Sequence, residues 1–461
     1  MIFIRRESPF KIQQIVCRTC RMYQAKGNVT GQQYLKNSLH SYQFASNLQF
    51  NERINDLKEK GQKIFHLGFG QSPFPVPPHA EQVLKENAGR AEYFPVKGIL
   101  ELRKAIIDFH AKQDGLHQFT LENCVVGPGS KELIFLLMSV IGGDVLLLSP
   151  TWTTYKPQAV LSNHKVFVIP TSYEKHWKLT PAMIEKVYSE NTIKENSLLI
   201  FCNPDNPTGS SYTKDELIAL GSEMRKRKML VLSDEIYGRL SFNDNHLSLA
   251  QFYPEGTVLS CGISKWASCG GWRLGYHLYP SHLKDICNVV AGAASNTYTS
   301  AAAPIQLAAV SLLQYDEHSQ NYVKHCKRIL HRVATFCCKK LSSCGVKVHL
   351  PSSGYYIFPD FEVIRAQLEK RGITTGSGMC DALLEEAGIA LMSGGPAYLH
   401  PLDQLTVRLC YINFDGTKAL KASEAIGLGE HLPESFVETE CSETYQAINI
   451  LHDWVEKQKK L

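Results

Sequence analysis

Short hydrophobic runs alternate with amphipathic segments along the middle of the chain, from about Val125 to Leu313. Uninterrupted apolar runs of about four to eight residues are typical of strands buried on both faces, and apolar residues at helical spacing indicate helices. The predicted strands are Asp144–Leu148, Val166–Pro170, Leu198–Cys202, Met229–Leu232, Thr257–Ser260 and Arg273–Tyr279. The predicted helices are Glu132–Ile141, Thr213–Lys228, Leu283–Ala293 and Ile305–Leu313. This alternation predicts an α/β fold with a mainly parallel sheet flanked by helices, on which ligands bind at the carboxyl ends of the strands.

The pattern changes after a long predicted helix at Asp316–Ser343. Short predicted strands with helices between them follow, at Val346–Leu350, Tyr355–Pro359, Ala390–Met392 and Leu405–Tyr411. This change predicts a second, smaller α+β domain, which the segment before Pro73 joins. Because 461 residues exceed one ordinary core, we expect several units. They are an N-terminal arm or targeting segment (1–50), a small domain (51–75 with 326–461) and a large domain (76–325).

The composition argues against several classes of partner. The net charge is only +5 and the interior has no Lys/Arg run of the kind that tracks phosphates, so we expect no nucleic-acid partner. No apolar run approaches the roughly 18 residues of a membrane span, so we expect no membrane partner. The fourteen cysteines are scattered, and the CxxC of Cys17 and Cys20 has no second CxxC or His pair. We therefore expect reduced thiols and no metal site.

The segment from Met1 to Asn51 has an unusual charge balance. Glu7 is its only acidic residue. Basic residues are interspersed with hydrophobic ones, at Arg5, Arg6, Lys11, Arg18, Arg21, Lys26 and Lys36. An acidic-poor, Arg-bearing and amphipathic N-terminus is typical of a mitochondrial transit peptide. The sequence therefore favours a mitochondrial location, and the alternative is an ordinary N-terminal arm on a cytoplasmic protein.

Two chemically distinctive residues directly follow predicted strands. Asp234, in the sequence SDEIY, comes after the run MLVL, where a carboxylate can bind an ion, a sugar hydroxyl or a protonated ring nitrogen. Its structural alternative is a cap. Lys265, in the pair Ser264-Lys265, comes after the run Thr257–Ile263. Burial and neighbouring cations lower the pKa of an amine and make it a Schiff-base nucleophile, whereas the alternative is a solvated loop lysine.

Three turns carry glycine or proline where a ligand could approach. Gly270–Gly275 contains Arg273, which can bind a phosphate with two parallel donors. Gly127–Lys131 lies between a strand and a helix and would aim backbone N–H groups at an anion. Asn203–Gly209 (NPDNPTG) forms a rigid turn after a buried strand.

Together and in this order, NPDNPTG, SDEIYG, SK and GGWRLG resemble the fold-type-I pyridoxal-phosphate enzymes, specifically the class I/II aminotransferases of the aspartate aminotransferase superfamily. The resemblance covers roughly Ile64 to Gly416. It implies a mainly parallel seven-stranded sheet sandwiched by helices, with pyridoxal 5'-phosphate as cofactor. It also implies amino-acid and 2-oxo-acid substrates and a homodimer with shared active sites.

The resemblance assigns roles around the cofactor. Lys265 would form the Schiff base (the internal aldimine) and shuttle a proton, Asp234 would pair with the pyridine nitrogen, and Tyr237 and Asn206 would bond the phenolic oxygen. The phosphate would be held by Arg273, Ser264, Gly129, Ser130 and Lys131. Trp152 would stack on the ring, with core packing as its alternative. We also expect cis peptide bonds at Asn206–Pro207 and Ser149–Pro150, where turns aim Asn206 and Trp152.

On the substrate side, Arg408 would grip the α-carboxylate, Gly70 would close over the substrate and Asn206 would also contact it. Tyr93 would reach the phosphate of the neighbouring subunit. One departure is Gly262, where some relatives carry a phosphate-binding hydroxyl, which Ser300 could replace. No residue is identifiable as the reader of the substrate side chain.

The motifs leave three functions open. The leading one is a transaminase that acts through Lys265. The second is a lyase or synthase of the same fold type, catalysing β-elimination or resembling aminocyclopropane-carboxylate synthase, because such enzymes share nearly all of these residues. The third is a non-catalytic cofactor-binding module, which the intact set of Tyr, Asn, Asp, Lys and Arg residues disfavours.

Overall fold

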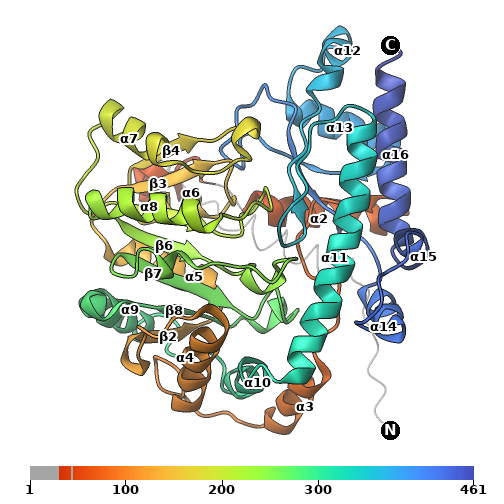
Figure 1. The fold of residues 1–461 in the computed structure, drawn as a ribbon. Coiled ribbons are helices and arrows are strands. Elements are labelled where there is room, and N and C mark those ends of the chain that lie inside the picture. Colours follow the sequence, from red (N-terminus) through yellow and green to blue (C-terminus); the bar gives the residue numbers. More distant parts are fainter. Residues whose placement is uncertain (1–30, 43–44) are drawn as a thin grey trace, which may run out of the picture. The chain divides into compact units, whose positions relative to one another are not determined.

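A seven-stranded sheet forms the centre of the computed structural model, which describes residues 31–42 and 45–461 (Figure 1). Its strand order is β2-β8-β7-β6-β5-β3-β4. The strands are β2 (Cys124–Gly127), β3 (Val145–Ser149), β4 (Val166–Pro170), β5 (Leu198–Cys202), β6 (Leu230–Asp234), β7 (Thr257–Gly262) and β8 (Gly275–Leu278). Only the pairs that include β8 are antiparallel. The predicted mainly parallel sheet is therefore confirmed.

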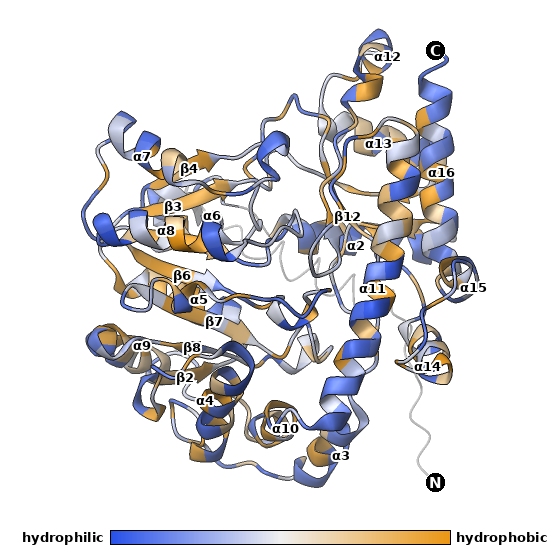
Figure 2. Ribbon diagram, viewed as in Figure 1, coloured by the Kyte–Doolittle hydropathy of each residue, from blue (hydrophilic) through white to orange (hydrophobic). Residues whose placement is uncertain are grey.

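Helices cover both faces of this sheet, because consecutive strand side chains point to opposite sides. Val145 and Leu147 of β3 belong to a core cluster with α5, α6 and α9, whereas Leu146 and Leu148 belong to one with α7 and α8. The strands are accordingly mostly hydrophobic (Figure 2), although β6 ends in Asp234 and β8 contains His277. The helices are α3 (Pro78–Asn87), α4 (Leu100–Asp114), α5 (Ser130–Val140), α6 (Tyr155–Leu161), α7 (Pro181–Glu190), α8 (Lys214–Lys226), α9 (Lys284–Ser295) and α10 (Ala303–Leu313).

The long predicted helix is confirmed as α11 (Glu317–Ser343), whose N-cap Asp316 accepts a hydrogen bond from the Ser319 backbone N–H. It lies beside the C-terminal helix α16 (Ser442–Gln458) in Figure 1. The remaining helices of this region are α2 (Ser46–Glu59), α12 (Arg365–Lys370), α13 (Gly376–Ala387), α14 (Gly416–Ile426) and α15 (Phe436–Glu440).

Two small sheets join distant parts of the chain. β1 (Phe65–His66) pairs in parallel with β10 (Ile389–Ala390). β12 (Val407–Cys410) lies between β11 (Met392–Ser393) and β9 (Tyr356–Ile357). The segment before Pro73 thus pairs with the C-terminal region. Residues 45–461 belong to one compact unit, so the division into large and small domains stays a prediction.

The predicted strand at Val346–Leu350 is wrong. Only Lys347 pairs there, in an isolated bridge with Asp360. Val346 and Val348 are nevertheless buried, which explains why their pattern resembles that of a strand. Among the described residues, no helix is long and apolar enough to cross a membrane. The basic residues from Arg5 to Lys26 lie outside the described part of the chain.

Candidate active site

A cavity of about 520 Å³ opens where β5, β6 and β7 end. Cys202 and Asp234, the last residues of β5 and β6, line it together with Lys265 just beyond β7. Every predicted site residue borders this cavity except Gly129 and Tyr93. The carboxyl ends of neighbouring parallel strands meet at one edge of a sheet, which is why these separate motifs converge.

Lys265 extends its amine into this cavity. Nζ donates a hydrogen bond to the Gly70 carbonyl oxygen at 3.0 Å and lies 5.6 and 5.7 Å from the ring centres of Tyr237 and Tyr355. Burial of the amine, reinforced by the positive charge of Arg408, lowers the pKa of Lys265 to about 8. Near neutral pH a useful fraction of this amine is therefore unprotonated, as a Schiff-base nucleophile requires.

The Asp234 carboxylate accepts a hydrogen bond from one neighbouring side chain. The Tyr155 hydroxyl donates to Oδ2 at 2.7 Å, while Oδ1 is buried and has no hydrogen-bond partner among the described residues. Burial raises the pKa of Asp234 to about 6, and the hydrogen bond from Tyr155 opposes that rise. A buried carboxylate oxygen without a donor suits a ligand N–H group.

Two cations and a tight turn form an anion site at the start of α5. Gly129 has a φ of 90°, and a Cβ there would lie 2.2 Å from Arg273 Nη2, so glycine lets the guanidinium approach the turn. Ser130 and Lys131 open α5, where the first turn of a helix leaves N–H groups without intrahelical partners. Burial lowers the pKa of both Lys131 and Arg273. A bound anion would relieve this cost.

The other ring-side residues complete the wall of the cavity. Asn206 follows β5, and its buried Oδ1 has no partner within the described ranges. Trp152 packs edge-on against Tyr155 with ring centres 5.1 Å apart. Lys131 Nζ also lies 5.1 Å from the ring centre of Trp152. Trp152 lines the cavity and also packs against a core cluster, so its stacking on the cofactor ring stays a prediction. Ser264 borders the cavity beside Lys265.

Arg408, Gly70 and Tyr356 form the opposite wall. Arg408 is buried on β12 and donates from Nη2 to the Gly68 carbonyl oxygen at 2.6 Å. Its guanidinium lies 4.8 Å from the ring centre of Tyr356 and 5.2 Å from that of Tyr398. Its buried Nε has no hydrogen-bond partner in the part of the chain that the structure describes. A carboxylate could use this donor capacity.

Tyr93 and Gly129 are the predicted residues that do not line the cavity. Gly129 affects the cavity indirectly, because its lack of a side chain lets the Arg273 guanidinium lie against the turn. The Tyr93 side chain is 87% exposed, so its role toward a second subunit stays a prediction. At Gly262 a Cβ would lie 2.8 Å from the Leu274 carbonyl oxygen, so a larger side chain has no room there. Ser300 does not border the cavity.

Sequence reasoning missed three groups. Tyr155 opens α6 three residues after Trp152, and the two ring centres lie 5.1 Å apart. Tyr356 had no local signal. The hydroxyls of Ser72 and Ser268 lie 2.6 Å apart on the cavity wall, and Ser268 also bonds the Tyr322 hydroxyl at 2.7 Å.

The expectation about proline geometry is half correct. Ser149–Pro150 is cis, as predicted. Asn206–Pro207 is not among the cis bonds, whereas Asn203–Pro204, three residues earlier, is, so that prediction was wrong. The Asn203 N–H donates to the Asp234 carbonyl oxygen at 3.0 Å, and the Asn203 side chain donates to the Leu247 carbonyl oxygen. These bonds fix the start of the turn at Asn203, the residue before its first proline.

Potential metal ligands gather away from this cavity. Within the described residues, one group of three such side chains occurs, at Cys344, His452 and Glu456. Glu456 Oε1 is already ion-paired with Lys459 Nζ at 2.8 Å. None of these residues borders the cavity.

The residues that line the cavity fit pyridoxal phosphate. The unpartnered Asp234 Oδ1 suits the protonated ring nitrogen, and Asn206 is positioned on the same side of the cavity. The turn at Gly129, closed to any Cβ by Arg273, suits the phosphate. Lys265 supplies the amine.

Comparisons with known proteins agree with this fit. The family model for class I and II aminotransferases matches residues 62–426. The chain is 32% identical to an aspartate aminotransferase of Pinus pinaster, over 73% of this chain and 70% of that protein. It is 29% identical to an asparagine–oxo-acid transaminase of Streptococcus mutans, over 74% of this chain and 86% of that protein.

Solved structures show the same fold. An aspartate aminotransferase from Thermus thermophilus with maleate has a TM-score of 0.77 and 24% identity, over 91% of this chain and 99% of that one. An aromatic aminotransferase from Pyrococcus horikoshii OT3 has a TM-score of 0.71 and 25% identity, over 88% of this chain and 100% of that one.

Proposed function

The chain belongs to the class I and II aminotransferases, and from this premise we propose that its cavity moves an amino group between an amino acid and a 2-oxo acid with Lys265 as the cofactor-bearing residue. It is a pyridoxal-phosphate-dependent enzyme of fold type I. The observation that carries the assignment is the amine of Lys265, with its pKa lowered to about 8, in one cavity with the half-bonded carboxylate of Asp234.

When bound, pyridoxal phosphate supplies an electron sink for the charge left on the substrate α-carbon. Asp234 would keep the ring nitrogen protonated through Oδ1, and Tyr155 would hold that carboxylate in place from the other side. Lys131 and Arg273 would hold the phosphate at the start of α5. The Lys265 amine would accept a proton from the α-carbon and return it, because its lowered pKa suits transfer in both directions near neutral pH.

Arg408 would orient the substrate. Its guanidinium is buried, retains free donor capacity at Nε and is supported by aromatic rings on two sides. The relatives are named for different amino acids, among them aspartate and asparagine, so their names select no side chain for this protein. The proposal therefore covers α-amino acids and 2-oxo acids as a class, since all of them carry the carboxylate that Arg408 suits.

A two-step spectral experiment tests this function. Individual amino acids are added to the holoenzyme, and the visible absorption of the Lys265-linked cofactor should convert to that of the amine form. A 2-oxo acid should then restore the original spectrum. Release of ammonia with no lasting spectral change would instead identify a lyase, and Lys265→Ala provides the inactive control.

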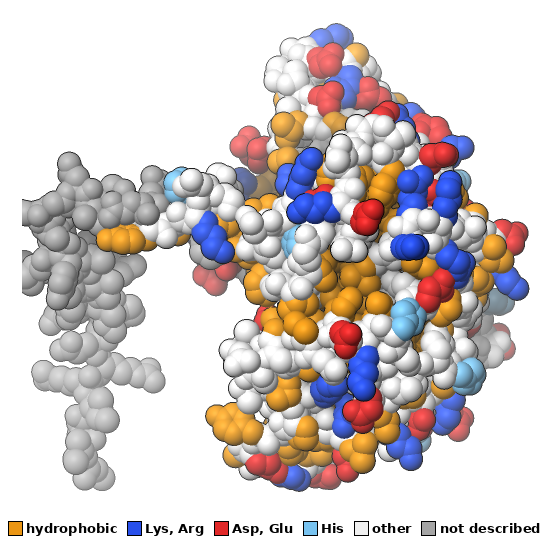
Figure 3. Space-filling model, turned by 90° about the vertical axis from the view of Figure 1, so that its left-hand side faces the viewer, with side chains coloured by type: hydrophobic (Ala, Val, Ile, Leu, Met, Phe, Trp, Pro, Cys, Tyr) orange, Lys and Arg blue, Asp and Glu red, His pale blue; other side chains and the backbone are white. Residues whose placement is uncertain are grey.

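A homodimer with shared sites is part of the same proposal. Tyr93 is 87% exposed and absent from the cavity of its own chain, and the nearby Leu100 is 56% exposed. Hydrophobic side chains gather along the middle of the face seen in Figure 3, as a partner-binding surface requires. Co-expression of Tyr93→Ala and Lys265→Ala chains should restore about a quarter of wild-type activity, because each mixed dimer would keep one intact site. No restoration would refute shared sites.

The N-terminus suggests a mitochondrial location. Its support is compositional, because Glu7 is the only acidic residue before Glu52. Fractionation of cells that express the full chain, with N-terminal sequencing of the mature protein, tests this. Recovery of the uncleaved chain in the cytosol would contradict it.

A further inference from the structure

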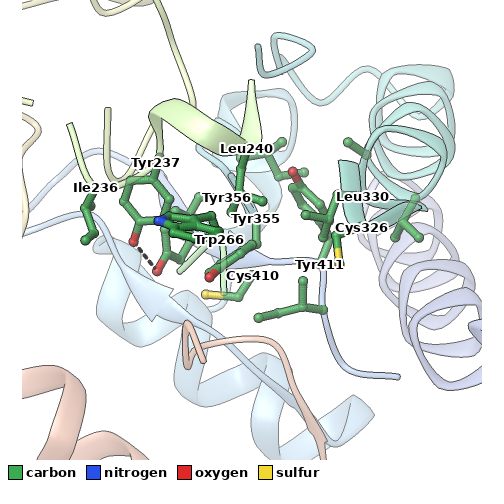
Figure 4. Close-up of a cluster of buried hydrophobic side chains, with 14 of the residues drawn as sticks. Ile236, Tyr237, Leu240, Trp266, Cys326, Leu330, Tyr355, Tyr356, Cys410 and Tyr411 are labelled. Atoms are coloured by element: carbon green, nitrogen blue, oxygen red, sulfur yellow. Dashed lines mark hydrogen bonds between the residues drawn. The ribbon is translucent and has the colours of Figure 1, made fainter. Parts of the chain in front are cut away.

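Tyr356 touches both walls of the cavity. It begins β9 and is paired with Cys410 of β12, which places its side chain beside that of Arg408, two residues away on β12. Its hydroxyl lies 3.0 Å from the hydroxyl of Tyr237, and Figure 4 shows the two hydroxyls pointing toward one another. Tyr356 therefore contacts one residue assigned to the cofactor ring and one assigned to the substrate carboxylate.

Gly70 keeps the Tyr356 hydroxyl in place. A Cβ at position 70 would lie 1.9 Å from that hydroxyl oxygen, so the tyrosine occupies the space that any side chain there would need. The Gly70 carbonyl oxygen meanwhile accepts from Lys265 Nζ at 3.0 Å. The Tyr356 hydroxyl thus sits in a closely packed position rather than at the end of a mobile side chain.

The chemistry of hydroxyl groups decides the direction of the Tyr237–Tyr356 bond. A phenol has one proton to donate and can accept further hydrogen bonds. When Tyr237 donates its proton to the anionic oxygen of the cofactor ring, it can only accept from Tyr356. Burial raises the pKa of Tyr356 to about 12, so the Tyr356 hydroxyl keeps its proton at any physiological pH and can be that donor.

We propose that Tyr356 is a positioning residue that donates a hydrogen bond to Tyr237 and supports the Arg408 guanidinium with its ring, which couples the cofactor side of the site to the substrate side. A hydrogen bond received by Tyr237 polarises its own O–H and strengthens the bond that Tyr237 gives to the cofactor. This inference rests on the proposed function, because it requires Tyr237 to face the cofactor oxygen.

The first test is a pH titration of the visible absorption of the holoenzyme. A bond donated to the ring oxygen favours the unprotonated form of the Lys265–cofactor linkage, so Tyr237→Phe should raise the apparent pKa of that transition. Tyr356→Phe should raise it in the same direction by roughly 10–30% of that shift, the size of cooperative strengthening in a hydrogen-bond chain. In the Tyr237→Phe background, Tyr356→Phe should add nothing, because its effect passes through Tyr237.

Tyr398→Phe is the matched control. It removes a buried tyrosine hydroxyl whose ring also lies beside Arg408, but that hydroxyl bonds the sulfur of Met392 and not Tyr237. The titration of this variant should follow that of the wild type. An equal shift in Tyr398→Phe, or a Tyr356→Phe shift that persists without the Tyr237 hydroxyl, would overturn the inference.

The second test separates the ring from the hydroxyl. The probe is 2-methylalanine, an amino acid without an α-hydrogen, whose binding to the holoenzyme is followed by absorption. Tyr356→Phe keeps a ring 4.8 Å from the Arg408 guanidinium and should bind it as the wild type does, whereas Tyr356→Leu should weaken binding roughly 2- to 30-fold through loss of the cation–π contact. Equal affinity in both variants would refute the support of Arg408. Failure of Tyr237→Phe to shift the titration would instead refute the cofactor role assigned to Tyr237.

Discussion

The ring side and the carboxylate side of the cavity are built in opposite ways. The ring side consists of Asp234, Asn206 and Lys265, which end or follow the adjacent parallel strands β6, β5 and β7. The carboxylate side consists of Gly70, Tyr356 and Arg408, which come from distant parts of the chain and meet only because β9 pairs with β12 and β1 pairs with β10. One side follows from the order of strands in a sheet, and the other depends on tertiary pairing.

The two sides also differ in which polar groups they leave without a partner. On the ring side the unpartnered groups are acceptors, because Asp234 Oδ1 and Asn206 Oδ1 lack a donor among the described residues. On the carboxylate side the unpartnered group is a donor, Arg408 Nε, although a backbone carbonyl and two tyrosine rings already hold the guanidinium. The acceptor of Asp234 therefore suits a ligand N–H group, and the donor of Arg408 suits a carboxylate.

The largest expected effect is that of Lys265→Ala. Turnover should fall below detection, because acid–base catalysis alone contributes about 10²–10⁴-fold and the covalent attachment is lost as well. Borohydride reduction followed by mass spectrometry should find no cofactor bonded to the chain. A reducible linkage that survives in the mutant would contradict the assignment of Lys265.

Arg408→Lys should be the most damaging change on the carboxylate side. An ammonium lacks the two parallel donors of a guanidinium, and misplacement of the substrate costs about 10²-fold in kcat/KM. The loss should be similar for every amino acid, with cofactor affinity unchanged. Steady-state kinetics with amino acids of several side-chain classes measure this. A loss confined to one class would make Arg408 a specificity residue.

Two glycine variants should separate effects on the ring side of the cavity from effects on its carboxylate side. Gly129→Ala places a Cβ against Arg273 at a φ of 90° and should loosen the cofactor, by about tenfold for a cost of 1.4 kcal/mol. Gly70→Ala places a Cβ against the Tyr356 hydroxyl and should raise KM more than it weakens cofactor binding, because it reaches the cofactor only through the Tyr356–Tyr237 hydrogen bond. Equilibrium dialysis of the cofactor and substrate kinetics on both variants provide the comparison. The same defect in both would erase the distinction between the two sides.

Tyr155→Phe tests the electrostatics of the ring side. The Tyr155 hydrogen bond lowers the pKa of Asp234, so its loss should raise that pKa above about 6. Protonated Asp234 cannot pair with a protonated ring nitrogen, so cofactor affinity should begin to fall at a higher pH than in the wild type. Cofactor binding measured as a function of pH gives this acid limb. An unmoved limb would show that Tyr155 does not act on Asp234.

The smallest expected effect belongs to Ser268→Ala. It removes the hydroxyl that joins Ser72, beside Gly70, to Tyr322 on α11. Loss of about 1 kcal/mol from one such hydrogen bond should raise KM about fivefold with little change in kcat. Hydrogen exchange of the peptide that contains residues 67–76 should become faster. Ser311→Ala, which removes a hydroxyl bonded only locally to the Ala308 carbonyl, is the control.

Particular residues show how far sequence reasoning extends. The local sequence was enough to predict Lys265, Asp234 and Arg273. Each lies beside a hydrophobic run, and the apolar residues of that run are enough to predict that it is buried. Val346–Leu350 was mistaken for a strand because buried valines give the same pattern whether or not a neighbouring strand pairs with them. Tyr356 could not be recognised, since its partner Tyr237 is 119 residues away and nothing local distinguishes it from Tyr355.

The sequence by itself determined the alternation of strands and helices, the position of Lys265 at a strand end and the turn chemistry at Gly129, since these depend on burial and backbone freedom within short segments. Tertiary structure alone decided that the Tyr356 hydroxyl lies between Gly70 and Tyr237 and that Arg408 lies beside the Tyr356 ring. Those contacts depend on the register of β9 against β12, and a shift of one residue there would turn Tyr356 to the other face of its sheet.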